Sequence, residues 1–162
     1  MKFSIFAKSQ KPPLCLKALE VAQTQIGVRE IPKGSNWGPE VSVYLQSVGI
    51  KFPASWCMAF VYWCHDKAAS GLRIKNPMYK TGGVLLEWNK SKSKFSNTPQ
   101  PGAVFIMDYG RGLGHTGIVE SFTKDEIFTI EGNTNDTGSR EGYEVCRRTR
   151  PRKNVLGYLV FK

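Results

Sequence analysis

Cys57 is the cysteine in this sequence whose surroundings best suit a nucleophile. It follows a loop-like stretch, residues 53–56, and it opens a strongly apolar run that is predicted to be a helix. The start of a helix presents unpaired backbone N–H groups and the positive end of the helix dipole, which favour a thiolate and can also hold an oxyanion. The alternative is that Cys57 is a small buried side chain. That alternative fits the other three cysteines better: Cys15, Cys64 and Cys146.

The base that takes the proton of a catalytic thiol must come from one of two histidines. His65 lies eight positions after Cys57 on the same predicted helix. A rise of 1.5 Å per residue separates the two by roughly 12 Å, beyond hydrogen-bond reach. His115 lies at the start of a predicted strand, where its small neighbours allow another element to approach the ring. His115 is therefore the predicted base, and the alternative is a surface histidine in a turn.

A catalytic imidazole is normally held in one tautomer by a third polar group. The next predicted strand, residues 127–130, runs into Glu131 and Asn133. An antiparallel neighbour can bring this strand end close to His115, so either side chain could orient the ring. The alternative is that both are ordinary turn residues.

The elements that must position these residues change type along the chain. Apolar residues recur at helical intervals in the first half, and the predicted helices cover residues 14–26, 41–48, 57–71 and 84–89. The second half is rich in Val, Ile, Phe, Tyr and Thr, and the predicted strands cover residues 103–108, 116–123, 126–131, 143–149 and 155–161. Helices followed by antiparallel strands indicate an α+β fold, in which the helix from Cys57 packs on a small sheet.

Length and composition indicate one folded domain. The 162 residues are 41% hydrophobic and 12% aromatic, enough for a core without disulfide or metal staples. Because Pro12 and Pro13 block a helix, we expect a short arm over residues 1–13 and a single domain over residues 14–162. The cysteines are too widely spaced for a disulfide framework, so we expect free thiols. We also expect a monomer.

The net charge of +10 favours a polyanionic partner, a class that includes nucleic acid, anionic membranes and cell walls. A nucleic-acid-binding module is the strongest alternative from another class, because a basic run lies near the C-terminus: Arg147, Arg148, Arg150, Arg152 and Lys153. Aromatic side chains are not interleaved with this run, so the sequence disfavours that alternative.

The sequence contains no signal-peptide pattern and no apolar run long enough to span a bilayer. We therefore expect a protein that is made in the cytoplasm, does not insert into membranes, and reaches any site of action outside the cell by other means.

Four motifs together resemble the CHAP family of cysteine, histidine-dependent amidohydrolases/peptidases: residues 55–61, 101–105, 114–119 and 131–133. They occur in the order and at the spacing of the family, and the likeness covers about residues 14–162. The resemblance implies a papain-like fold, in which N-terminal helices carrying the cysteine pack on a C-terminal antiparallel sheet of five to six strands carrying the histidine.

By this resemblance, Cys57 attacks an amide carbonyl of peptidoglycan, His115 takes the thiol proton and returns it to the leaving amine, and Glu131 orients His115. Asn133 matches a further polar position of the site. Such proteins cleave either between muramic acid and L-alanine or within the stem or bridge peptides, and both alternatives stay open. A phage lysin, an antibacterial effector and a housekeeping wall enzyme all fit, and the basic charge suits an anionic cell wall.

Two departures from the family pattern bear on metals and on catalysis. Ala103 stands where many members carry an acidic residue, at a position that is not catalytic. Residues 49–53 lack the Asp-rich calcium loop that some members carry before the cysteine. No Cys-x-x-Cys pair or spaced histidines suggest zinc, so we expect no metal and no cofactor.

The candidates for the walls of a substrate groove are Asn36, Trp37 and Trp56. The alternative is that these aromatic side chains cap the core. A catalytically inactive CHAP fold that only binds cell wall is disfavoured, because every catalytic position is filled.

Overall fold

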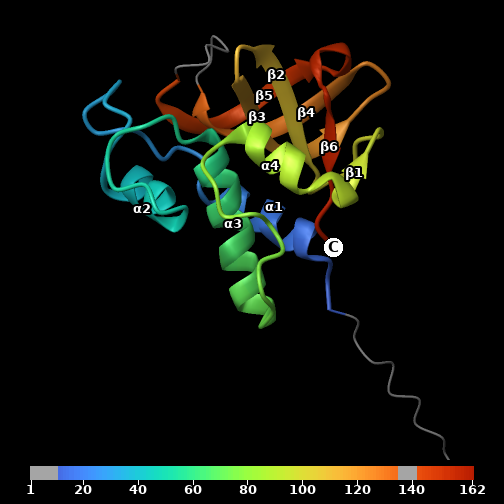
Figure 1. The fold of residues 1–162 in the computed structure, drawn as a ribbon, viewed down its shortest axis with the longest axis horizontal. Coiled ribbons are helices and arrows are strands. Elements are labelled where there is room, and N and C mark those ends of the chain that lie inside the picture. Colours follow the sequence, from blue (N-terminus) through green and yellow to red (C-terminus); the bar gives the residue numbers. More distant parts are fainter. Residues whose placement is uncertain (1–10, 135–141) are drawn as a thin grey trace, which may run out of the picture.

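The computed structural model describes residues 11–134 and 142–162 of the chain. The helices come first along the chain (Figure 1), and they are α1 (Leu14–Thr24), α2 (Pro39–Ser47), α3 (Cys57–Leu72) and α4 (Val84–Lys90). The strands are β1 (Phe95–Ser96), β2 (Val104–Gly110), β3 (Leu113–Phe122), β4 (Glu126–Thr134), β5 (Glu144–Pro151) and β6 (Gly157–Leu159). Two short 3-10 helices are η1 (Lys92–Lys94) and η2 (Arg152–Asn154).

The strands form one six-stranded sheet in the order β1-β6-β2-β3-β4-β5. Strands β2, β3 and β4 each pair with the next strand along the chain, and β6 returns to pair with both β1 and β2. Every one of these pairings is antiparallel. The predicted α+β fold is confirmed, with N-terminal helices on a C-terminal antiparallel sheet of six strands.

The helix α3 is the central buried helix of the molecule. It contacts β3 and β4 on one face of the sheet, and α1 and α2 pack against it; Figure 1 shows these three helices grouped on one side of the sheet. Gly132 on β4 permits the close approach of α3 to the sheet, because a Cβ at this position would come within 2.7 Å of the Trp56 ring and 2.9 Å of Phe60. The missing side chain therefore allows the N-terminal end of α3 to lie against β4.

The other face of the sheet carries a second apolar cluster, which includes Phe105, Met107 and Tyr158. Side chains alternate between the two faces of a strand. Met107 is the strand partner of His115, so the His115 side chain belongs to this second face.

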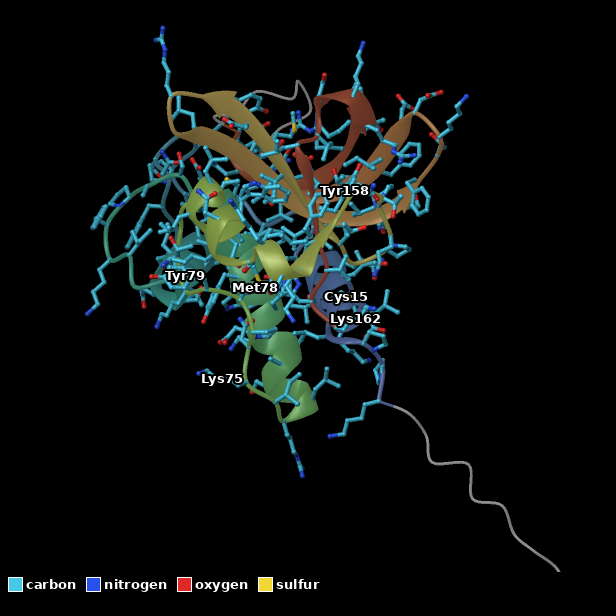
Figure 2. The ribbon with its side chains drawn as sticks, turned by 45° about the vertical axis from the view of Figure 1, so that its right-hand side comes forward. Cys15, Lys75, Met78, Tyr79, Tyr158 and Lys162 are labelled. Carbon is cyan, nitrogen blue, oxygen red and sulfur yellow. The ribbon has the colours of Figure 1, made fainter. Side chains whose placement is uncertain are left out.

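The C-terminal end of the chain lies beside the start of α1. The backbone N–H of Cys15 donates to the carbonyl of Phe161 at 2.9 Å, and Figure 2 shows Cys15 and Lys162 next to each other. The same end contacts α3, where the rings of His65 and Phe161 meet edge to face at 5.5 Å. These contacts hold the C-terminal residues that follow β6 against both α1 and α3.

The predicted helices are all present, with ends within two residues of those expected. The strands differ more. The strand β3 begins at Leu113 and β4 continues to Thr134, because Gly114 pairs with Asp108 and Thr134 pairs with Glu144. The sequence placed His115 at the start of a strand, whereas the structure places it inside β3, two residues after the strand begins. The strand β1 was not predicted, and β6 is shorter than the expected 155–161.

Most of the predicted N-terminal arm, residues 1–10, lies outside the described residues, and residues 11–13 precede α1 without helical structure. No helix within residues 11–134 and 142–162 is long and apolar enough to cross a membrane.

Candidate active site

Cys57 is the first residue of α3, as the sequence predicted. The residue before it, Trp56, has φ −124° and makes no side-chain cap to the helix. The first-turn N–H groups therefore have no capping side chain, and they lie around the start of the helix where Cys57 stands. Cys57 is 6% exposed, so its thiol is largely shielded from bulk water.

His115 comes to the site from β3 and is 1% exposed. Its Nε2 lies 2.8 Å from Oε2 of Glu131, a carboxylate that can only accept. Nε2 must therefore carry the proton, and Nδ1 is the nitrogen left for another partner. Nδ1 makes no hydrogen bond that meets the usual geometric limits within the described part of the chain.

The thiol of Cys57 is nevertheless close enough to act on the His115 ring. Burial is the largest single effect on the pKa of His115 and lowers it. Hydrogen bonding to Cys57 and to Glu131, together with the charges of both, outweighs burial and raises the pKa of His115 to about 9. The ring is therefore held cationic at neutral pH by two groups, the carboxylate of Glu131 and the sulfur of Cys57.

Glu131 receives four hydrogen bonds on its two carboxylate oxygens. Oε2 accepts from Nε2 of His115 and from Nη2 of Arg150, and Oε1 accepts from Nε of Arg150 and the hydroxyl of Thr129. Burial raises the pKa of Glu131, but the bonds and charges of Arg150 and His115 outweigh it and lower the pKa to about 2. Glu131 is thus an ionised carboxylate with no exposed surface.

The close approach of His115 and Glu131 depends on a glycine between them. Gly117 lies two residues after His115 on the same face of β3, next to Glu131 on β4. A Cβ at Gly117 would lie 2.7 Å from Cγ of Glu131 and 2.9 Å from the ring of Phe105. Only a residue without a side chain leaves room for Glu131 to reach across to the ring of His115.

Asn133 does not make the hydrogen bond to Nε2 of His115, which goes to Glu131. Asn133 is 2% exposed and has φ +54°. It lies where the pairing of β4 with β5 shifts register between Glu131 and Thr134. Of the two residues that the sequence offered as partners for the ring, the structure brings Glu131 to it.

The three residues predicted to line a groove lie in different environments. Asn36 and Trp37 are half-buried on the loop before α2, where Ile31 N–H donates to the carbonyl of Trp37 at 2.9 Å. Trp56 has no exposed surface, and its indole N–H donates to Oε1 of Glu30 at 2.8 Å. Trp56 therefore packs in the core. The prediction that it lines a substrate groove was wrong, and the alternative, that the ring caps the core, holds for this residue.

Cys15, Cys64 and the second histidine, His65, do not belong to the site. All four cysteines are free thiols, as expected. Burial raises the pKa of Cys15 and holds the pKa of Cys64 well above its usual value. His65 is fully buried in α3, with Nδ1 2.9 Å from the carbonyl of Val61, and burial lowers its pKa to about 4. Both thiols and the ring are therefore held uncharged in the core.

Sequence reasoning missed Arg150, which it had grouped with a basic run. Arg150 is 8% exposed and holds Glu131 with two hydrogen bonds, whereas Arg147 on the same strand is exposed and pairs with Glu120. The sequence carries no signal for this difference, because the burial of position 150 on β5 is a property of the fold. Arg150 is therefore not part of a basic surface that could contact nucleic acid.

Comparisons with known proteins agree with this geometry. Residues 49–133, just over half of the chain, match the family model of the CHAP domain. A solved structure described as "The crystal structure of Ly7917" is 20% identical, with a TM-score of 0.52 over 90% of this chain and 61% of that chain. A second, "The crystal structure of Ly7917 with the hydrolyzing product of MDP", is 19% identical, with a TM-score of 0.50 over 90% of this chain and 62% of that chain.

The chain thus spans about three fifths of the length of these two structures. No curated protein is similar enough in sequence to count as a relative.

Proposed function

This chain belongs to the CHAP domain family, and on that premise we propose that it is a cysteine amidohydrolase that cleaves amide bonds of bacterial peptidoglycan. The observation that carries the proposal is the array of Cys57 at the start of α3, His115 beside it, and Glu131 bound to His115. Thiol, imidazole and carboxylate in this order are the groups that covalent amide hydrolysis requires. The proposal takes residues 14–162 as one catalytic domain that acts as a monomer.

The reaction begins from a cationic His115 and an anionic sulfur on Cys57. The sulfur attacks the amide carbonyl carbon, a C–S bond forms, and the carbonyl electron pair moves to oxygen. Backbone N–H groups at the start of α3 stabilise that oxyanion, because they are directed at the place where the charge develops. When the oxyanion collapses, the C–N bond breaks and Nδ1 of His115 gives its proton to the leaving amine.

The second half of the reaction restores the enzyme. The acyl group is now a thioester on Cys57, and neutral His115 takes a proton from an attacking water molecule. Collapse of the second oxyanion breaks the C–S bond and releases the carboxylic acid half of the substrate. Glu131 stabilises the imidazolium throughout and keeps Nδ1 directed at the reacting groups, while Asn133 supplies a further polar group at the site.

We place the scissile bond between muramic acid and L-alanine, with cleavage within stem or bridge peptides as the alternative. The muramoyl bond is common to most cell walls, and no feature of the chain marks a pocket for one bridge peptide. One of the two similar structures was solved with "the hydrolyzing product of MDP", a peptidoglycan fragment, which supports a substrate of this class. Asn36 and Trp37, partly exposed on one loop, are proposed as a wall of the substrate groove.

Mass spectrometry of the products of purified peptidoglycan identifies the bond. Every cut releases one new amine, so we expect new N-terminal L-alanine and no new amines elsewhere. New amines within the stem or bridge would instead assign an endopeptidase. If reduced enzyme releases no new amine from peptidoglycan of several sources, the hydrolase proposal fails and a module that only binds the cell wall becomes the better account.

The positive charge of the protein favours contact with an anionic wall. We propose that it acts at the bacterial cell wall, as a phage lysin or an antibacterial effector does.

A further inference from the structure

The carboxylate of Glu131 is held far more tightly than its bond to His115 alone requires. Arg150 spans both of its oxygens, with Nε 2.9 Å from Oε1 and Nη2 2.6 Å from Oε2. Thr129 adds a third contact on Oε1 at 2.8 Å. A carboxylate bound at both oxygens in one plane by a guanidinium cannot rotate without breaking two charge-assisted hydrogen bonds.

Arg150 and His115 share one oxygen, Oε2 of Glu131. Any rotation of the carboxylate would therefore move the acceptor of the His115 hydrogen bond, and the imidazole ring would turn with it. Because Glu131 is fully buried and Arg150 nearly so, water does not replace these bonds at low cost.

The same strand provides an internal comparison. Arg147 also makes two hydrogen bonds to a carboxylate, that of Glu120, at 2.9 and 3.0 Å. That pair is on the surface, with side-chain exposures of 59% and 22%, whereas Arg150 and Glu131 are at 10% and 0%. Two arginines in one strand thus make the same kind of ion pair, and only one of the pairs touches the catalytic histidine.

We propose that Arg150 is a positioning residue for the amide hydrolysis described above: it fixes the carboxylate of Glu131 so that His115 presents Nδ1 to Cys57. This inference rests on the proposed function for its catalytic meaning. Arg150 does not touch the reacting atoms and acts through Glu131 alone.

Arg150 also sets how much of the negative charge of Glu131 is available to His115. The ionisable groups around the ring are Cys57 from α3, Glu131 from β4 and, through Glu131, Arg150 from β5. Tyr109 on β2 and Cys146 on β5 act on Arg150, and Arg148 is the strand partner of Thr129. Of these groups, Arg150 is the cation that competes with the imidazolium for the same carboxylate oxygen.

The test compares Arg150→Met with Arg147→Met, a matched loss of one arginine from the same strand. In Arg150→Met, we expect kcat to fall about ten- to a hundredfold with KM nearly unchanged, because misplacing a catalytic group by about 1 Å can cost about a hundredfold. In Arg147→Met, we expect kcat to stay at the wild-type value, because the Arg147 pair is on the surface and away from His115.

Titration of His115, followed by NMR, gives a second readout. The pKa of His115 would not change in the Arg150 variants if Arg150 only stabilised the fold. Removing the cation of Arg150 leaves the whole charge of Glu131 to the imidazolium, so the pKa of His115 should rise by about 1. The chain contains one other histidine, His65, whose pKa of about 4 keeps its signals apart. Arg150→Lys retains the cation, so it should keep the His115 titration while recovering only part of kcat, because an ammonium cannot span both oxygens.

If Arg150→Met matches Arg147→Met in both kcat and the His115 titration, the proposal is overturned. Should Arg150→Met fail to fold, Arg150→Lys decides, since an unchanged kcat in that variant would also overturn it. The NMR titration needs no substrate, so if the wild-type protein does not cleave peptidoglycan, a raised His115 pKa in Arg150→Met still supports the link from Arg150 to His115, and only the proposed function fails.

Discussion

Replacing Cys57 with serine is expected to abolish the release of new amines from purified peptidoglycan. A serine hydroxyl at this position would have the same place at the start of α3, but it is a far weaker acid and a weaker nucleophile than a thiol, so the attack on the amide carbonyl should fail. Because the substitution exchanges one small buried atom, the melting temperature should remain close to that of the wild-type protein. The measurement is the rate of amine release at equal enzyme concentration, beside a thermal melt.

The matched controls are Cys15→Ser and Cys146→Ser, which alter the free thiols at the start of α1 and on β5. We expect Cys146→Ser to retain its activity fully, and Cys15→Ser to retain it after a loss of stability, since Cys15 is buried at the start of α1. Full activity in Cys57→Ser would remove the covalent mechanism.

Replacing His115 with alanine is expected to reduce turnover by roughly 10² to 10⁴, the usual cost of losing a general acid and base. The pH profile of the wild-type enzyme should show the same group. The folded-state pKa of His115 is raised to about 9, so activity that needs the imidazolium should persist through neutral pH and fall as the pH rises through about 9. A profile of kcat/KM between about pH 6 and about pH 10 covers this limb.

His65→Ala is the matched control for the loss of a histidine. His65 is fully buried and bonded to the carbonyl of Val61, so its removal should leave a cavity in α3 and lower the melting temperature. Its effect on kcat should be small in the fraction that remains folded. The reverse pattern, with His65 governing rate and His115 only stability, would mean that the base has been assigned to the wrong residue.

The proposed pair of Cys57 and His115 could be selected from the sequence because local features mark both positions. Cys57 follows a loop and begins an apolar helix, and the spacing along one helix is enough to separate His65 from it. The choice of Glu131 over Asn133 required the structure, because both lie near the end of β4 and the space left by Gly117 is what lets Glu131 reach the ring.

The role of Arg150 could not be predicted, since it depends on which residues of β4 lie next to this position of β5 in the sheet. The strand pairing aligns Arg150 with Ile127 and Cys146 with Glu131, and the long guanidinium side chain then reaches along the sheet to Glu131. The interpretation of Trp56 failed for a related reason. A tryptophan beside a nucleophile can face a groove or the core, and the contact of Gly132 with its ring is what brings it inside.

Alkylation of the native protein tests the central claim, that Cys57 is the nucleophile, most directly. The reduced enzyme is treated with increasing amounts of iodoacetamide near neutral pH, and each sample is divided between peptide mapping by mass spectrometry and the amine-release assay. The account predicts that the fraction of activity lost equals the fraction of Cys57 modified, while Cys15 and Cys64, whose burial raises their pKa, remain as free thiols. Full modification of Cys57 with activity retained would contradict it.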